Sequence, residues 1–325
     1  MSNSDFQPGL VSTIIPVFNR PILVKEAIES VLAQTYRPIE VIVVDDGSTD
    51  NTLSVLSRLA EQNVELTILT QVNAGPGVAR ELGRQNARGE FIQYLDSDDL
   101  LMVDKFSLQV SVLNDHPSCV VAYGKTEATL IGEPTKGLAM RQTGICFDAM
   151  FPAFLRSRWW GTSTPLYRAS VLNSVGAWLP LINEEDWEYD CRIASLGGKL
   201  AYVDEFVSNA RRHDDHLSDQ GSKDITKLKH RCMAQQEIYK HARAYMLLDA
   251  RESEITAEDW SFYSKSVFLL ARQCAAAGMA DQASVMVELS IAANGRMTIQ
   301  HRVFCFLVSI VGWCNASKLI KLVGK

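Results

Sequence analysis

The sequence predicts an α/β protein with a mostly parallel sheet, followed by an all-helical extension. In the first hundred residues, apolar β-branched segments alternate with segments whose apolar residues recur at helical spacing. The strand segments are apolar on both faces, which is typical of parallel strands covered by helices on both sides. After residue 222 the strand signals stop, and the pattern is helical almost to the end of the chain.

The first two strands are predicted at 10–18 ("LVSTIIPVF") and 39–47 ("IEVIVVDDG"). Pro21 opens the helix between them, because proline suits the first turn of a helix and apolar residues repeat every four positions after it. The next predicted elements are a helix at 48–62, a strand at 64–70, a helix at 75–89 and a strand at 90–96. This alternation is that of a doubly covered parallel sheet.

A mixed pattern follows from residue 119. We expect a strand and hairpin at 119–130, a helix at 147–155, a strand at 161–168, a helix at 183–196 and a strand at 199–213. A charged linker ends this domain, which we place at 1–222. The extension at 223–325 contains two antiparallel helices joined at "AGMAD" (277–281), like one unit of a helical repeat.

Composition argues against several classes of protein. The 325 residues carry a formal net charge of −6, which argues against nucleic acid as a partner, because nucleic-acid binders usually present a basic surface. The seven cysteines include no CxxC pair, so neither a disulfide framework nor a thiolate zinc site is predicted. The N-terminal residues lack the pattern of a secretory signal. Together these features predict a cytoplasmic protein.

The C-terminal segment at 299–325 has two interpretations. Between Arg302 and Lys318 lie fifteen uncharged residues, fewer than the roughly 20 that span a bilayer. In the first interpretation the segment is a terminal helix packed on its own protein. In the second it lies in a membrane interface, with its lysines near anionic headgroups, and the protein is peripheral on the cytoplasmic face of the membrane.

Polar clusters follow three of the predicted strands: "PVFNR" at 16–20, "DDGS" at 45–48 and "DSDD" at 96–99. Ligands bind beyond the carboxyl ends of parallel strands, so we expect the clusters to converge on one crevice. The three carboxylates within 96–99 repel one another, which predicts a positively charged partner such as a divalent cation. The other interpretation of "DSDD" is a turn that caps the next helix.

These motifs, together with "NAGPGVARELGRQNARGEFIQYLDSDDL" and "EEDWEYDCRIASLG", resemble those of the family 2 inverting glycosyltransferases. The resemblance covers roughly residues 10–215, in the order and spacing of the family. It implies a GT-A fold with a Rossmann-like sheet, and transfer of a sugar from a nucleotide-diphosphate donor, of UDP or dTDP type, to a hydroxyl acceptor. Whether the acceptor is a glycan, a lipid-linked sugar or a protein is not decided by these residues.

The resemblance also assigns donor-binding residues. It implies that Asp98 binds a divalent Mg or Mn ion, with His213 as an additional ligand, and that Asp96 lies near the ribose or a metal-bound water. It implies that Asp46 accepts a hydrogen bond from the nucleotide base and that Arg80 reaches the nucleotide. A surface ion pair for Arg80 and a solvated loop for His213 are the simpler interpretations. The residues implied to complete the nucleotide pocket are Pro16, Phe18 and Arg20.

An inverting transfer needs a base for the acceptor hydroxyl, whose pKa lies far above 7. By resemblance to the family's Glu-Asp motif, Asp186 is the base and Glu185 orients the acceptor. The other interpretation is an ordinary acidic helix start. Asp186 has no basic residue four positions later, whereas Glu188 has Arg192, a spacing that predicts an ion pair on the solvent face of the helix.

Trp160 and the adjoining Gly161 are candidates for binding the acceptor. The faces of sugar rings pack well on indole rings, so a tryptophan beside a predicted strand suggests an acceptor platform. Packing in the core explains Trp160 nearly as well.

Other functions share parts of this pattern. A sugar-phosphate nucleotidyltransferase has the same kind of sheet and metal carboxylates, but a glycine-rich basic loop after its first strand, where this chain has "PVFNR". A dinucleotide-binding dehydrogenase needs G-x-G-x-x-G at that place. A non-catalytic binding protein on the same fold has no use for a base such as Asp186.

Overall fold

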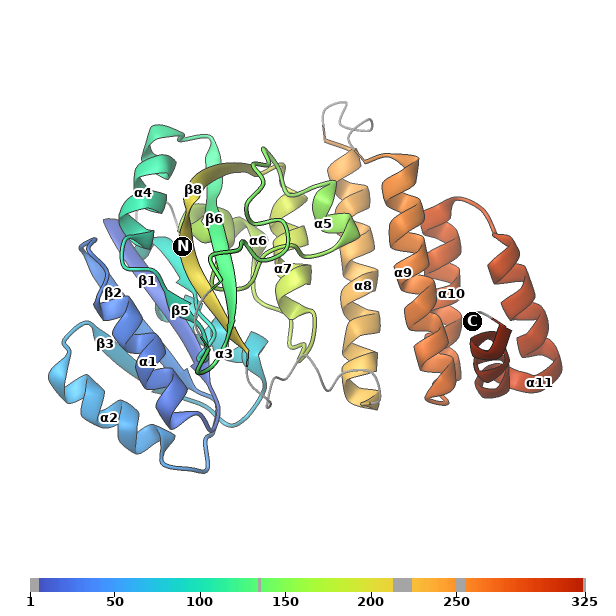
Figure 1. Ribbon diagram of the computed structural model, residues 1–325, viewed down its shortest axis with the longest axis horizontal. Helices are drawn as coiled ribbons and strands as arrows, with labels where there is room; N and C mark the ends of the chain where they lie inside the picture. The colour runs from blue at the N-terminus through green and yellow to red at the C-terminus, as the bar shows by residue number, and fades with distance from the viewer. Residues whose placement is uncertain (1–5, 134–135, 213–223, 249–254, 324–325) are drawn as a thin grey trace. The chain divides into compact units, whose positions relative to one another are not determined.

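The computed structural model describes residues 6–133, 136–212, 224–248 and 255–323 (Figure 1). The chain divides into two compact units, the first comprising residues 1–150 and 158–214 and the second residues 151–157 and 215–325. The domain boundary predicted near residue 222 falls outside the described residues.

The segment 151–157 belongs to the second unit, although the sequence pattern placed it in the first domain. Phe151 packs against Tyr245, with ring centroids 5.2 Å apart. The guanidinium of Arg156 donates a 2.6 Å hydrogen bond to the buried carboxylate of Asp259. Because Asp259 lies 103 positions further along the chain, local sequence patterns do not show this association.

In the described part of the chain, eight strands form one sheet in the order β3-β2-β1-β4-β7-β6-β8-β5. The strands are β1 (Gln7–Val17), β2 (Ile39–Asp45), β3 (Leu66–Thr70), β4 (Gly89–Tyr94), β5 (Leu100–Leu101), β6 (Cys119–Leu130), β7 (Leu166–Arg168) and β8 (Lys199–Arg212). β1 pairs in parallel with β2 and β4, β2 with β3, and β6 with β8. The antiparallel pairs are those of β7 with β4 and β6, and of β5 with β8. The predicted mostly parallel sheet is confirmed.

Helices cover both faces of this sheet. In the first unit they are α1 (Pro21–Leu32), α2 (Thr52–Gln62), α3 (Pro76–Asn86), α4 (Lys105–Asp115), α6 (Ala169–Val175) and α7 (Glu185–Ala194). Alternate residues of β1 point to opposite faces: Ile15 shares a core cluster with Val24 and Ile28 of α1, whereas Ile14 meets Gly83 of α3. A Cβ on Gly83 would lie 2.4 Å from Ile14, so glycine at this position lets α3 approach the sheet closely.

The sheet brings the polar loops together at one edge. Val17, the last residue of β1, is opposite Asp45, the last residue of β2. On the other side of β1, Ile14 is opposite Tyr94, the last residue of β4. Because these strands run in the same direction, the loops that carry the three polar clusters leave the sheet side by side.

Three of the predicted elements differ in the structure, and β5, α4 and α6 were not predicted. Residues 119–130 form one continuous strand, β6, rather than a strand and hairpin, because β8 pairs with it along almost its whole length. The helix expected at 147–155 is reduced to α5 (Ala153–Arg156). The strand expected at 161–168 is reduced to β7, because a turn in which the Thr164 N–H donates to the Gly161 carbonyl replaces its first half.

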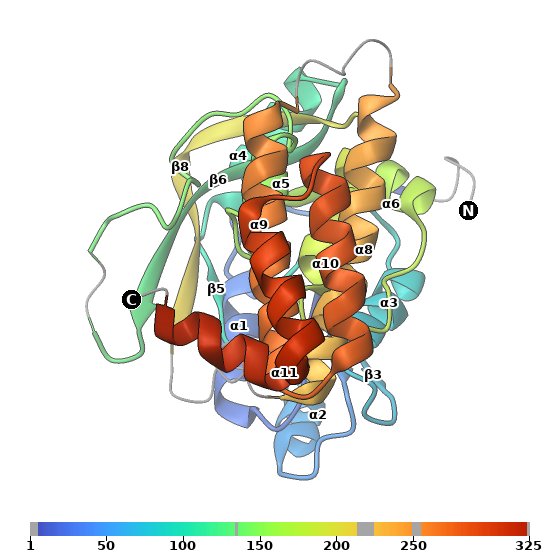
Figure 2. The same cartoon turned by 90° about the vertical axis from the view of Figure 1, so that its right-hand side faces the viewer.

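The second unit is helical, as predicted (Figure 2). Besides α5, its helices are α8 (Ile225–Met246), α9 (Ala257–Ala276), α10 (Ala280–Asn294) and α11 (Ile299–Val323). A capping box at Thr256 and Asp259 starts α9. Three residues connect α9 to α10, which confirms the helix pair predicted around "AGMAD".

Candidate active site

The three strand-end clusters meet, as predicted. In the loop after β1, the Asn19 N–H donates a 2.9 Å hydrogen bond to Ser48 Oγ in the loop after β2. The neighbouring Arg20 donates from Nη1 to Asp98 Oδ2, in the loop after β4, at 2.7 Å. Pro16, near the end of β1, is buried, whereas Phe18, directly after the strand, is 44% exposed, so Phe18 presents a ring to solvent at the edge of the predicted nucleotide pocket.

Asp46 organises the loop before α3. Its Oδ1 accepts hydrogen bonds from Gln71 Nε2 at 2.7 Å and from the Ala74 N–H at 2.8 Å. Its Oδ2 accepts from the Gly75 N–H at 2.9 Å. Gly75 has a φ of +90°, a conformation that favours glycine. The residue predicted to recognise the base is therefore held in place by three donors, and its orientation depends on the start of α3.

Arg80 is a buried bridge between two parts of the site. Its Nη2 donates to Asp96 Oδ1 at 2.7 Å and its Nη1 to Glu185 Oε1 at 2.8 Å. The guanidinium also lies 5.0 Å from the centroid of the Trp178 ring. Burial opposes the charge of Arg80, but the carboxylates outweigh it and raise its pKa. The simpler interpretation of Arg80 as a helix-surface ion pair is wrong, since the residue is 3% exposed.

The acidic loop 96–99 contains side chains in three different environments. The Asp96 carboxylate is the most open, with 34% of the side chain exposed, whereas that of Asp98 is 6% exposed and pairs with Arg20. Asp99 is buried and accepts from Ser163 Oγ at 2.8 Å and from the Arg211 N–H at 3.0 Å. Burial and the neighbouring aspartates raise the pKa of Asp99 well above its usual value. Asp99 therefore joins β8 to the loop.

The acidic loop offers ligands for a divalent cation. Among the described residues, no three His, Cys, Asp or Glu side chains form a preformed metal cluster. Asp96 and Asp98 nevertheless offer carboxylate oxygens, and Mg sites are commonly built from one or two carboxylates together with substrate phosphates. The donor set fits a cation that binds together with a diphosphate, provided that Arg20 releases Asp98. His213, the other predicted ligand, lies outside the described residues.

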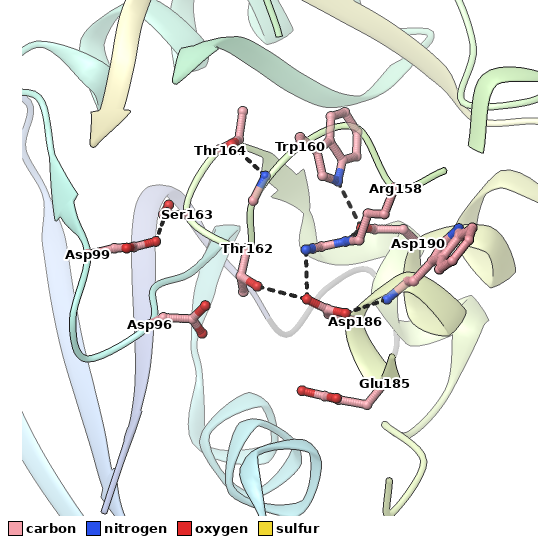
Figure 3. A network of polar contacts seen from close by, with 12 residues as sticks. Asp96, Asp99, Arg158, Trp160, Thr162, Ser163, Thr164, Glu185, Asp186 and Asp190 are labelled. Atoms are coloured by element: carbon pink, nitrogen blue, oxygen red, sulfur yellow. Dashed lines mark hydrogen bonds and ion pairs between the residues drawn. The ribbon is translucent and has the colours of Figure 1, made fainter. Parts of the chain in front are cut away.

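Asp186 lies in the first turn of α7 with one quarter of its side chain exposed. Its Oδ2 accepts from Arg158 Nη1 at 2.7 Å and from Thr162 Oγ1 at 3.2 Å, and its Oδ1 accepts from the Trp187 N–H at 2.7 Å (Figure 3). Burial alone would raise the pKa of Asp186, but the charges of Arg158 and Arg80 hold it below its usual value. The carboxylate is thus ionised and oriented at neutral pH.

Glu185 differs from its neighbour. Its side chain is 8% exposed and pairs with Arg80. Burial and the charge of Asp186 raise the pKa of Glu185, although Arg80 opposes this. Figure 3 shows the carboxyl groups of Asp96, Glu185 and Asp186 around one region between α7 and the loop after β4. The acceptor-orienting role of Glu185 stays a prediction, and the contact in the structure is with Arg80.

Arg158 was not among the residues predicted from the sequence. Its Nη1 contacts Asp186, and its Nε donates to Asp190 Oδ2 at 2.8 Å. Asp190 also accepts from Trp160 Nε1 at 2.8 Å and from Tyr167 Oη at 2.6 Å. The sequence signal that could have pointed to Arg158 is the pair Asp186 and Asp190, which lie four positions apart on α7 with no basic residue between them. Two acids so close on one helix favour a cation from another part of the chain.

The acceptor platform predicted at Trp160 is wrong for this structure. Trp160 is 0% exposed, its indole N–H is used by Asp190, and its ring packs on Trp159 at 4.7 Å between centroids. Gly161 is partly exposed and stays a candidate. The Glu188–Arg192 ion pair is confirmed at 2.6 Å, but Glu188 is 1% exposed, so the pair does not lie on a solvent face.

The sequence of residues 12–168 matches the family described as "Glycosyl transferase family 2". This segment belongs to that family. It carries the loops after β1, β2 and β4, together with Arg158, and it ends before α7. The roles assigned to Glu185 and Asp186 therefore rest on the motif and on the geometry of the site.

Relatives match part of the chain. Over 147 residues the chain is 36% identical to an "Uncharacterized glycosyltransferase" of Rickettsia felis, a match that covers 45% of this chain and 24% of that protein. Over 212 residues it is 26% identical to the "Putative glycosyltransferase EpsH" of Bacillus subtilis, with 62% of this chain and 61% of that protein covered. The chain thus spans about a quarter of the length of the Rickettsia relative.

Solved glycosyltransferases have the same fold. The S. aureus protein TarS 1-349, in complex with UDP-GlcNAc, matches with a TM-score of 0.60 and 17% identity over 87% of this chain and 88% of its own. The mannosyltransferase PcManGT from Pyrobaculum calidifontis, in complex with GDP-Man and Mn2+, matches with a TM-score of 0.54 and 18% identity over 97% and 87%. These likenesses confirm the predicted GT-A fold.

Proposed function

We propose that this chain is an inverting glycosyltransferase. It transfers a sugar from a nucleotide-diphosphate donor, of UDP or dTDP type, to a hydroxyl acceptor in the synthesis of a polysaccharide, glycolipid or glycoprotein. Family membership supports the glycosyltransferase activity. TarS was solved with UDP-GlcNAc and with UDP, and PcManGT with GDP-Man, which supports a nucleotide sugar as the donor.

One observation carries the proposal. Arg80 connects Asp96, on the donor side, with Glu185, which is adjacent in sequence to the candidate base Asp186. Such a bridge couples the groups that hold the nucleotide to the helix that carries the base. A protein that only bound nucleotide would have no need to hold an ionised, partly exposed carboxylate at that place, with Arg158 paired to it.

In the proposed reaction, Asp186 takes the proton of the acceptor hydroxyl while the hydroxyl oxygen attacks the anomeric carbon of the donor sugar. The new carbon–oxygen bond forms on the face opposite the nucleoside diphosphate, which leaves with the electron pair of the broken bond. Arg158 and Thr162 donate to Oδ2 of Asp186, so the proton goes to Oδ1, which among the described residues accepts a single hydrogen bond, from the Trp187 N–H. In this proposal Arg80 is the cation that stabilises the charge of the leaving diphosphate.

We further propose that the activity depends on Mg or Mn. Asp98, together with Asp96, would hold the ion. The bound ion would act as a Lewis acid that offsets the negative charge of the diphosphate. Without the ion, the guanidinium of Arg20 neutralises the carboxylate of Asp98. The exchange of Arg20 for the ion at Asp98 makes cation binding and donor binding interdependent.

Incubation of the full chain with Mn and a panel of nucleotide sugars tests this proposal. Release of nucleoside diphosphate supports the transferase. Formation of nucleoside triphosphate on addition of pyrophosphate would instead show a nucleotidyltransferase, and binding without turnover would show a binding protein. The nucleotide sugar that raises the melting temperature most identifies the donor.

A further inference from the structure

The last helix, α11, consists of two pieces. Gly312 interrupts it with a φ of 75° and a ψ of 167°, and Figure 2 shows the two pieces at an angle to each other. By length and composition, residues 299–319 pass as a membrane span. The first piece, 299–311, is however only about 20 Å long at 1.5 Å per residue, against a hydrocarbon core of about 30 Å. Neither piece crosses a bilayer alone.

One face of α11 is anchored in its own unit. Phe304 and His301 are buried, and the Phe268 ring of α9 contacts both, with centroids 5.5 and 4.6 Å away. In the second piece, Ser317 Oγ donates a 2.9 Å hydrogen bond to the Arg272 carbonyl of α9. Both pieces are therefore held by α9, and insertion across a membrane would break these contacts.

The opposite face of the first piece is apolar and exposed. Ile299, Val303, Phe306 and Ile310, which we call the outer stripe, are 80%, 47%, 64% and 63% exposed. Their steps of four, three and four residues place them on one side of the helix, and at 100° per residue this side is opposite to that of His301 and Phe304. A contiguous row of large exposed apolar side chains indicates an interaction surface.

The segment of the sequence that carries the outer stripe has basic residues and no acidic ones. From residue 295 to the end, the sequence contains five basic residues and no Asp or Glu: Arg296, Arg302, Lys318, Lys321 and Lys325. With a net charge of −6 for the whole chain, the remaining 294 residues carry −11. Arg302 and Lys318 are exposed in the structure. The segment thus differs in sign from the rest of the protein.

We propose that the outer stripe docks on an anionic lipid surface, where it lies parallel to the membrane plane. The apolar side chains enter the acyl boundary while the basic residues contact anionic headgroups, a combination typical of interfacial helices. A second copy of the chain is the less favourable occupant, because a two-fold contact would place +5 against +5.

Vesicle binding by the full-length protein tests this inference without reference to catalysis. Wild type is mixed with vesicles of phosphatidylcholine alone and with vesicles that also contain phosphatidylglycerol, an anionic lipid that gives the surface a negative potential. We expect binding to the anionic vesicles only, weakened by salt. In Phe306→Ser/Ile310→Ser the affinity falls at least about tenfold, because two exposed apolar side chains no longer enter the lipid.

The matched control is Phe262→Ser/Val285→Ser, which removes exposed apolar residues of α9 and α10 in the same unit, 48% and 40% exposed. It is expected to bind anionic vesicles like wild type. Absence of vesicle binding by wild type, or equal loss in both double variants, would overturn the proposal. So would a wild-type dimer, seen by light scattering, that becomes monomeric in Phe306→Ser/Ile310→Ser, because a second copy would then cover the stripe.

Discussion

Replacement of Arg158 by glutamine tests how the candidate base is kept ionised. The guanidinium lies 2.7 Å from Asp186, and an opposite charge so close lowers the pKa of a carboxyl group by about 1 to 3 units. In Arg158→Gln the burial of Asp186 remains and opposes ionisation. The pKa of Asp186 therefore rises in this variant, and the protonated form of the carboxyl group becomes the more favoured one at mildly acidic pH.

The assay is the pH profile of kcat/KM for donor turnover. Asp186 must be unprotonated to act as a base, and its pKa in wild type lies below the usual 3.8. Wild type should therefore keep a flat profile further into the acidic range than Arg158→Gln, which should lose activity at a higher pH as Asp186 becomes protonated. A profile for Arg158→Gln that is as flat as that of wild type would refute the reasoning.

Stability needs a separate check in this variant. Arg158 also pairs with Asp190, which is 1% exposed, and loss of one partner of a buried ion pair costs about 3–5 kcal/mol. Thr162→Val provides a milder perturbation, because it removes only the 3.2 Å hydrogen bond to Asp186. The acidic side of its pH profile should shift in the same direction as that of Arg158→Gln, but by less. Arg156→Gln, which breaks a comparable contact to Asp259 in the second unit, should leave the profile unchanged.

Three further predictions concern binding and stability. Asp46→Asn should weaken binding of UDP at least about tenfold in calorimetry and leave pyrophosphate binding unchanged; equal losses would place Asp46 away from the base. Gly89→Ala should lower the free energy of unfolding, measured in urea, by about 1–3 kcal/mol, because its Cβ would lie 2.6 Å from the Leu10 carbonyl oxygen. Gly161→Ala should leave the free energy of unfolding unchanged, because the neighbours of its Cβ lie at 3.6 Å or more. Burial lowers the pKa of His301, so the folded protein favours the neutral ring, whereas the unfolded chain binds a proton more readily. The free energy of unfolding of wild type should therefore fall as pH drops below about 6.5, and it should fall less in His301→Gln.

The fold was largely predictable because its signals are local. The continuous apolar strands β1 and β2, and the proline at the start of α1, determine a covered parallel sheet without knowledge of distant contacts. The parts that were missed depend on distant partners. β6 extends as one strand because of β8, and segment 151–157 belongs to the second unit because Arg156 meets Asp259.

The same distinction applies to the candidate site. The acids at the strand ends follow from the sequence pattern, because the ends of parallel strands meet. Their partners do not: Arg80 lies 105 positions from Glu185, and Arg158 lies 28 positions from Asp186. Trp160 was misinterpreted because an indole that donates to a buried aspartate looks, in sequence, like one that stacks on a sugar.

The central claim is that Asp186 removes the acceptor proton during an inverting transfer. Proton NMR of donor turnover by wild type and Asp186→Asn tests it most directly, with Asp204→Asn, a change at an exposed acid of β8, as control. With an α-linked nucleotide sugar, wild type and Asp204→Asn should first release the β-anomer, and Asp186→Asn should be at least about 100-fold slower while it still binds the donor. An α-anomer as first product, or an unchanged rate in Asp186→Asn, would contradict the account.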